Sequence, residues 1–181
     1  MDVDTLIATL KEAVPRAELE AAPSVDPQTT IYVSRDQALA VLRTLRDRDD
    51  LAFAFLAELT AADFWPREPR FELVYILVSL AHKQRVRLKV RLHDNDARIP
   101  TVSDLWPAAN WLEREVWDLF GIVFDGHPDP RRLLMPEDWD GYPLRKDYPV
   151  QILKTPQAAE PLQVTEAEFR ANVEKDRLAR R

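Results

Sequence analysis

The first apolar stripe of the chain has the period of a helix. Leu6, Leu10 and Val14 are spaced by four positions, and Pro15 follows them directly. Asp4 precedes the stripe and can accept hydrogen bonds from the free N–H groups of a first helical turn. The pattern predicts a helix that is capped by Asp4 and ended by Pro15.

A short strand and a second helix are predicted next. Residues 29–33 are rich in β-branched side chains, which favours a strand. Residues 38–45 place apolar side chains at i, i+3, i+4 and i+7, the stripe of a helix that faces a core. Ser34 and Gln37 have the spacing of a capping box, so we expect their side chains to bond to the start of this helix.

Three runs typical of strands follow, and they differ in how many of their faces are apolar. Residues 51–60 and 71–80 are apolar on both faces, so the second is predicted as a central strand covered on both sides. Residues 85–93 alternate apolar with basic side chains, which predicts a half-exposed strand. Residues 65–69 and 81–84 are predicted as the connecting turns.

The last periodic segment closes the predicted domain. Leu112, Val116 and Phe120 share one face of a helix, and Gly121 suits the left-handed position that follows a helix end. The predicted fold class is α+β, a two-layer domain with a mixed, mostly antiparallel sheet and helices on one face, over residues 1–120.

Residues 121–149 follow no period of 2 or 3.6 and are predicted as an extended, irregular arm. They contain all three glycines of the chain and large apolar groups such as Leu134, Trp139 and Tyr148. This composition does not suit a solvated linker. The arm is therefore expected to dock on another surface, which is either that of its own domain or that of a partner.

The segment after the arm, residues 150–181, is predicted as a C-terminal tail. Thr165 and Glu168 have the spacing to cap a short helix that would carry Phe169 and Val173.

Composition narrows the classes of function. The chain has no cysteine, which excludes disulfides, thiolate ligation of iron–sulfur clusters and a cysteine nucleophile. The formal charge of −6 argues against a nucleic-acid binder, which needs a basic face. We expect neither a signal peptide at the acidic start nor a membrane span, because the longest apolar run, residues 73–81, is too short.

No group of residues predicts an active site. Glu113 and Glu115 are two positions apart on a helix and do not face each other. Arg114 and Asp118 are four positions apart, which predicts an ion pair. His127 lies in a proline-containing bend and is predicted as a hydrogen-bonding corner residue rather than a base. We expect no catalytic, cofactor-binding or metal-binding residue in this chain.

The helix end and the arm carry a recognisable signature. Residues 113–120 read EREVWDLF, His127 follows, and residues 131–134 read RRLL. Together with MPEDW at 135–139 and PLRKDYP at 143–149, they resemble the 30-kilodalton subunit family of respiratory complex I, known in bacteria as the C subunit. The chain departs from the family pattern at Pro130, where Leu is frequent, and at Tyr142, where His is frequent.

The resemblance implies a function at the level of an assembly, a proton-translocating NADH:quinone oxidoreductase. It implies that FMN, iron–sulfur clusters and quinone are carried by partner subunits and that this chain is a non-catalytic scaffold. The implied partners are the large quinone-site D subunit and the neighbouring B and I subunits, with no nucleic acid. The implied location is the cytoplasmic side of the bacterial inner membrane, with membrane association only through the complex.

The resemblance also implies which residues dock on the partner. Arg131, Arg132, Arg145 and Lys146 would pair with acidic groups there, because arginine binds carboxylates with two parallel hydrogen bonds. The whole implied docking set is Glu113, Arg114, Glu115, Asp118, Phe120, Gly121, His127, Pro128, Arg131, Arg132, Leu134, Pro136, Glu137, Asp138, Trp139, Gly141, Pro143, Leu144, Arg145, Lys146, Asp147 and Tyr148.

Three alternatives remain open at the level of sequence. The first is the equivalent subunit of a membrane-bound [NiFe]-hydrogenase or of a related quinone- or ferredoxin-linked dehydrogenase complex. The second is a stand-alone enzyme that uses His127 with Glu113 or Glu115. The third is a free-standing interaction module.

Overall fold

A computed structural model describes residues 2–23, 26–149, 167 and 169–171. The chain divides into two compact units, Met1–Tyr148 and Pro149–Arg181. In the second unit, residues 167 and 169–171 are helical. The predicted cap residues Thr165 and Glu168, and Val173, lie outside the described residues.

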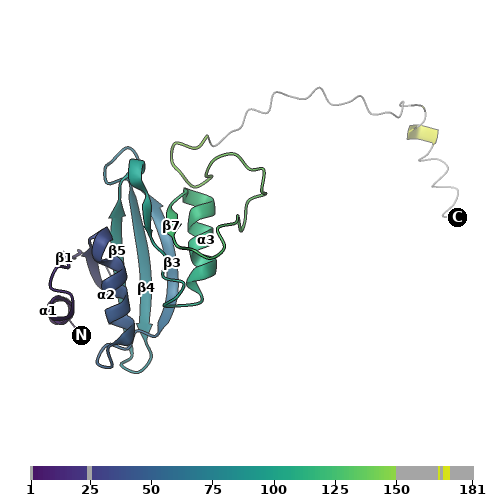
Figure 1. Cartoon of the computed structure of the whole chain (residues 1–181). Helices are drawn as coiled ribbons and strands as arrows, with labels where there is room; N and C mark the ends of the chain where they lie inside the picture. Colours follow the sequence, from purple (N-terminus) through teal and green to yellow (C-terminus); the bar gives the residue numbers. More distant parts are fainter. Residues whose placement is uncertain (1, 24–25, 150–166, 168, 172–181) are drawn as a thin grey trace, which may run out of the picture. The chain divides into compact units, whose positions relative to one another are not determined.

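A five-stranded sheet forms the centre of the first unit (Figure 1). The order across the sheet is β1 (Leu19–Ala21), β2 (Thr29–Val33), β5 (Gln84–Leu92), β4 (Phe71–Ser79) and β3 (Phe55–Asp63). β2 and β5 run parallel, and the other neighbouring pairs are antiparallel. The predicted mixed, mostly antiparallel sheet is therefore confirmed.

The core lies between one face of this sheet and the helices α1 (Val3–Ala13), α2 (Arg35–Asp47) and α3 (Ala109–Phe120). On β4 the side chains of Leu73, Tyr75 and Leu77 are fully buried in this core. On the other face of β4, residues 74, 76 and 78 are only half-buried. The prediction that this strand is covered on both faces is wrong, because the helices pack on one face of the sheet.

The helix starts differ from the predicted caps. The side chain of Asp2, not that of Asp4, accepts from the N–H of Thr5 and caps α1. Ser34 occupies the cap position of α2 as predicted, but its side chain makes no capping hydrogen bond. The backbone carbonyl of Ser34 accepts from the N–H of Gln37 instead, so the predicted capping box is wrong.

A second, two-stranded sheet joins the predicted arm to the domain. The 3₁₀ turn η1 (Asp94–Asp96) leads into β6 (Arg98–Pro100), which pairs in parallel with β7 (Val123–Asp125). Ile122 and Phe124, at the start of the predicted arm, are buried in the core. The sequence pattern missed both strands, because three residues are too few to show a period.

The third helix ends as predicted. Gly121 follows α3 with a φ of 74°, in the left-handed region, and its N–H bonds to the carbonyl of Trp117. Among the described helices, none combines the length and the apolar character that crossing a membrane requires.

Candidate partner-docking site

Helix α3 places three charged side chains at buried positions. Glu113 and Asp118 are fully buried, and Arg114 is nearly so. Buried charges are costly unless other groups pair with them. Arg114 and Asp118 bind the arm, whereas Glu113 binds the turn that precedes α3.

Asp118 fixes the middle of the arm. One of its carboxylate oxygens, Oδ2, accepts hydrogen bonds from three consecutive N–H groups, those of residues 133–135, at 2.7 to 3.0 Å. The other oxygen accepts from Arg132 Nη1 at 2.7 Å. Burial raises the pKa of Asp118, but these donors outweigh burial and lower it. The carboxylate therefore stays charged and anchors the arm to α3.

Arg114 binds the arm from the same helix. Its Nε and Nη2 donate to the backbone carbonyls of Arg131 and Arg132, each at 3.0 Å. Its Nη1 lies 3.5 Å from the carboxylate of Asp129. The predicted ion pair between Arg114 and Asp118 is wrong, because both side chains bind the arm instead of each other.

Glu113 holds the turn that precedes α3. Its two oxygens accept from the Thr101 hydroxyl at 2.5 Å and from the N–H of Val102 at 2.7 Å. Burial raises the pKa of Glu113 to about 7, although these two hydrogen bonds oppose the shift. Glu113 is thus a positioning group, directed at the domain and away from solvent.

His127 forms the corner at the start of the irregular part of the arm. Its Nδ1 accepts from the N–H of Asp129 at 3.0 Å, and its Nε2 lies 3.1 Å from the carbonyl of Asn110. This pattern requires the neutral ring with its proton on Nε2. The predicted role of a hydrogen-bonding corner is confirmed. Glu113 Oε2 lies 3.8 Å from Nε2, beyond hydrogen-bonding distance.

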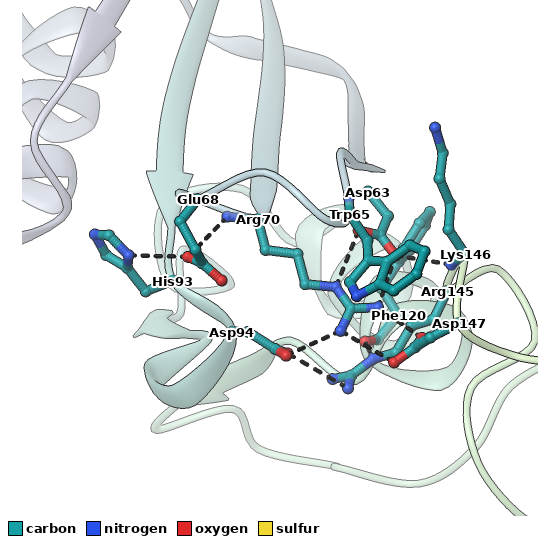
Figure 2. Close-up of polar contacts among 10 residues, drawn as sticks. All are labelled: Asp63, Trp65, Glu68, Arg70, His93, Asp94, Phe120, Arg145, Lys146 and Asp147. Atoms are coloured by element: carbon teal, nitrogen blue, oxygen red, sulfur yellow. Dashed lines mark hydrogen bonds and ion pairs between the residues drawn. The ribbon is translucent and has the colours of Figure 1, made fainter.

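Arg70 fixes the end of the arm to the sheet (Figure 2). Its guanidinium, only 2% exposed, makes two hydrogen bonds with Asp63, at 3.0 and 2.9 Å. It makes two more with Asp147 of the arm, at 2.6 and 3.2 Å, and one with Asp94 at 2.9 Å. One buried cation therefore joins β3, β4, η1 and the arm.

Asp63 is the counterpart of Asp118 at this second anchor. Besides Arg70, it accepts from the N–H groups of Lys146 at 2.8 Å and Trp65 at 2.9 Å. Burial raises the pKa of Asp63, but Arg70 and the two N–H groups lower it to about 2. The carboxylate is therefore charged at neutral pH. It holds the turn at Trp65 and the arm at Lys146 side by side.

Arg145 and Tyr142 close the arm over the end of α3. Arg145 Nε donates to the carbonyl of Phe120 at 2.5 Å, and its guanidinium stacks on the rings of Phe71 and Tyr142. The Tyr142 ring lies directly on Gly121, where an added Cβ would be 2.5 Å from a ring carbon. Glycine is required there for space as well as for its backbone conformation.

The structure separates the predicted docking set into two groups. Arg132 and Arg145, which were predicted to pair with a partner, bind Asp118 and the Phe120 carbonyl instead. The outward group is exposed. It consists of Glu115 on α3 and of what we call the outer face of the arm: Pro128, Arg131, Leu134, Pro136, Glu137, Asp138, Leu144 and Lys146. The inward group is buried or half-buried against the domain or against other parts of the arm, with Asp147 still partly exposed: Glu113, Arg114, Asp118, Phe120, Gly121, His127, Arg132, Trp139, Gly141, Pro143, Arg145, Asp147 and Tyr148.

Sequence reasoning missed the Arg70 anchor. Asp63 ends β3, Arg70 directly precedes β4 and Asp94 begins η1, so no local spacing connects them with Asp147. The available signal was a charged residue directly before an apolar strand. Among the described residues, no three His, Cys, Asp or Glu side chains are placed to hold a metal ion.

Comparisons with known proteins identify the family to which the chain belongs. Residues 31–152 match the family model for the respiratory-chain NADH dehydrogenase 30 Kd subunit. The chain belongs to this family. The C subunit of NADH-quinone oxidoreductase from Roseiflexus sp. (strain RS-1) is 44% identical over 150 residues, which cover 83% of this chain and 86% of that protein.

Two further relatives extend the comparison. The C/D subunit of NADH-quinone oxidoreductase from Nitrosospira multiformis is 47% identical over 133 residues, which cover 70% of this chain and 22% of that protein. A solved trypsin-resistant fragment of Nqo5 is 37% identical, with a TM-score of 0.55, and covers 68% of this chain and 98% of the fragment.

A chain of the membrane-bound sulfane sulfur reductase, an archaeal respiratory membrane complex, is also similar. It is 28% identical with a TM-score of 0.69, over 90% of this chain and 96% of that chain. The fold is therefore shared with one chain of a respiratory membrane complex that has a different name.

Proposed function

We propose that this chain is the non-catalytic scaffold, or C subunit, of a proton-translocating NADH:quinone oxidoreductase. FMN, iron–sulfur clusters and quinone would be bound by partner subunits, and this chain would hold none of them. Its place would be the cytoplasmic side of the bacterial inner membrane, reached through the complex. Its partners would be the large quinone-site D subunit and the neighbouring B and I subunits.

The division of the arm into an inward and an outward group carries the proposal. The inward group makes the anchoring contacts, so the arm has a defined path without any partner. The outer face nevertheless presents Leu134, 57% exposed, and Leu144, 51% exposed. Large apolar groups held outward on a fixed segment are typical of protein interfaces. The arm is thus shaped in advance for docking, which lowers the entropy cost of binding.

The relative from Nitrosospira multiformis supports the large quinone-site subunit as the main partner. That protein is a C/D subunit, and the match to this chain covers only 22% of its length. Two subunits joined in one chain are held near each other by the linkage. The outer face of the arm would contact the equivalent large subunit, with Lys146 facing its acidic groups. Arg131 already binds Asp129 with two hydrogen bonds, at 2.6 and 2.7 Å, and would present its exposed side to the same groups.

A second candidate is the equivalent subunit of a related membrane complex with another substrate. The observation that favours it is the similarity to the sulfane sulfur reductase chain, whose TM-score is 0.69. Against it, the relative from Roseiflexus is 44% identical over most of both chains, compared with 28% for the reductase chain.

Purification of the whole assembly tests the proposal. An affinity-tagged chain, expressed from its own locus, would be isolated from gently solubilised membranes and its neighbours identified by mass spectrometry. We expect the D, B and I subunits, a flavin-containing NADH-oxidising subunit, and NADH:quinone activity in the same fraction. A partner set without the flavin subunit would favour the second candidate. Recovery of the chain alone, in good yield and folded, would contradict both.

A further inference from the structure

Two aromatic side chains lie exposed where the sheet meets the end of the arm. Phe64 is 39% exposed and Trp65 is 50% exposed, in the turn between β3 and β4. The backbone N–H groups of Trp65 and Lys146 bind the two oxygens of the Asp63 carboxylate. Figure 2 shows the Trp65 ring and Lys146 close together beside the Arg70 anchor. We call Phe64, Trp65, Arg67 and Lys146 the turn–arm patch.

The backbone beneath the patch is fixed by the buried Arg70 anchor. Arg70 binds Asp63 at the end of β3 and Asp147 next to Lys146, so the turn and the arm share one buried cation. The backbone N–H of Trp65 is bound by Asp63, so the turn that carries this side chain loses little freedom when it binds, and tryptophan is enriched among residues that dominate interface energy. An exposed aromatic group on a fixed backbone is typical of a binding surface, whereas the tip of a mobile loop is not.

The charges left free around the patch are cationic. Among the described residues, the side chains of Arg67 and Lys146 have no hydrogen bond or ion pair. The nearby acidic groups are engaged: Asp94 and Asp147 by Arg70, and Glu68 by His93 at 3.0 Å and the Arg70 N–H at 3.2 Å. A ligand of the patch therefore meets apolar rings flanked by two unpaired positive charges.

We propose that the turn–arm patch binds a neighbouring protein subunit whose surface combines apolar side chains with Asp or Glu carboxylates. The proposal rests on the proposed function, since it needs an assembly in which such a neighbour exists. It adds a second contact surface next to the outer face of the arm. A protein fits better than an anionic membrane, because the two unpaired cations of the patch fall short of the cluster of about four to eight Lys or Arg side chains that is typical of binding to anionic lipids.

Photo-crosslinking in the intact complex tests this directly. A benzophenone amino acid would replace Phe64, which conserves an aromatic ring, and the same group at Leu80 would be the control. Leu80 is 75% exposed in the turn between β4 and β5. After illumination of the purified, tagged assembly, we expect position 64 to crosslink to one partner subunit, within a peptide that carries carboxylates. Position 80 should give no adduct with that peptide.

Charge-reversing substitutions form the second part of the experiment. Arg67→Glu and Lys146→Glu together should reduce the crosslinking yield at position 64 about fivefold and remove its dependence on salt. Arg85→Glu is the matched control, because Arg85 on β5 is also exposed and has no hydrogen bond or ion pair within the described part of the chain. It should leave the yield unchanged.

The outcomes separate the two proposals. A lipid adduct at position 64, no adduct there, or a yield unaffected by Arg67→Glu and Lys146→Glu would each overturn the patch. In all three cases the tagged chain would still recover its partner subunits, so the proposed function would be unaffected. A tagged chain that recovers no partner subunit at all would overturn both.

Discussion

Arg70 and Asp147, 77 positions apart in the chain, are joined by an ion pair of 2.6 Å between Nη2 and Oδ1. Because Arg70 also holds Asp63 of β3, this contact ties the last residues of the compact unit to the sheet. The irregular arm is therefore part of the domain's structure along its inner side. Any docking function belongs to its outer side.

Replacing Arg70 tests the anchor. Arg70→Ala would leave the buried Asp63 carboxylate without its cation, so the free energy of unfolding should fall by about 3 to 5 kcal/mol. Urea denaturation of the full chain measures this. Arg35→Ala is the control, since the side chains of Arg35 and its partner Asp96 are 36% and 48% exposed, and it should cost less than about 1 kcal/mol. Equal losses would show that Arg70 is not an anchor.

Removing the Asp118 carboxylate should release the middle of the arm. In Asp118→Ala, three N–H groups at residues 133–135 lose their acceptor, which would cost about 3 kcal/mol or more in stability. Hydrogen exchange of these amides should accelerate at least tenfold in the folded chain. Glu115→Ala, on the exposed side of α3, should leave their exchange unchanged. Unchanged exchange in Asp118→Ala would contradict the anchor.

Gly121 and Gly126 have similar backbone angles but different surroundings. Comparing their replacement by alanine therefore separates the cost of a steric clash from the cost of backbone strain. Gly121→Ala, at a φ of 74°, would place a methyl group 2.5 Å from the Tyr142 ring, whereas Gly126→Ala, at 82°, has no atom nearer than 3.6 Å. Gly126→Ala should cost about 1 kcal/mol from backbone strain alone, and Gly121→Ala clearly more. Thermal unfolding measures both, and Tyr142→Ala should recover part of the Gly121→Ala loss. Equal costs would refute the packing of Tyr142 on Gly121.

Glu113 should make stability depend on pH near neutrality. Its folded pKa of about 7 lies above its ordinary value of 4.5. The contribution of Glu113 to the free energy of unfolding is therefore largest below pH 4.5. It is lost as the pH rises from 4.5 through 7, by about 3 kcal/mol in all.

Glu113→Gln checks this pH dependence. Glutamine can donate to the Thr101 hydroxyl and accept from Val102, and it does not titrate. Denaturation between pH 5 and 8 should show the variant gaining stability relative to the wild type as pH rises. Glu115→Gln should follow the wild type throughout. A constant difference for Glu113→Gln across this range would rule out a raised pKa.

The sequence predicted the four longer strands of the central sheet but missed the three-residue strands β1, β6 and β7 and the contacts that anchor the arm, for a physical reason. Alternation along residues 85–93 and the glycine at 121 are local signals, and both were confirmed in β5 and at the end of α3. The partners of Asp118 lie 14 to 17 positions away, and Asp147 lies 77 positions from Arg70. Helical spacing suggested Arg114 as the partner of Asp118, but buried groups bind whatever donors the folded chain brings to them.

The candidate site shows the same limit. The signature residues were found from the sequence, but their division between an inward and an outward group was not. Burial decides this division, and the arm has no period from which burial could be predicted. Arg132 and Arg145 illustrate it, since each was expected to face a partner and each binds the domain.

Docking of the outer face on the large quinone-site subunit is tested by the amount of this subunit that is recovered with tagged variants of this chain. Leu134→Asp changes the outer face of the arm, and Leu80→Asp changes an even more exposed leucine in the turn between β4 and β5. If the outer face docks on the large subunit, Leu134→Asp should reduce its recovery at least about tenfold, since burying an unpaired charge at an interface costs several kcal/mol. The unfolding free energy of this variant should stay unchanged, and Leu80→Asp should recover the large subunit normally. Full recovery of the large subunit with Leu134→Asp, or equal loss with both variants, would show that the outer face of the arm is not its docking surface.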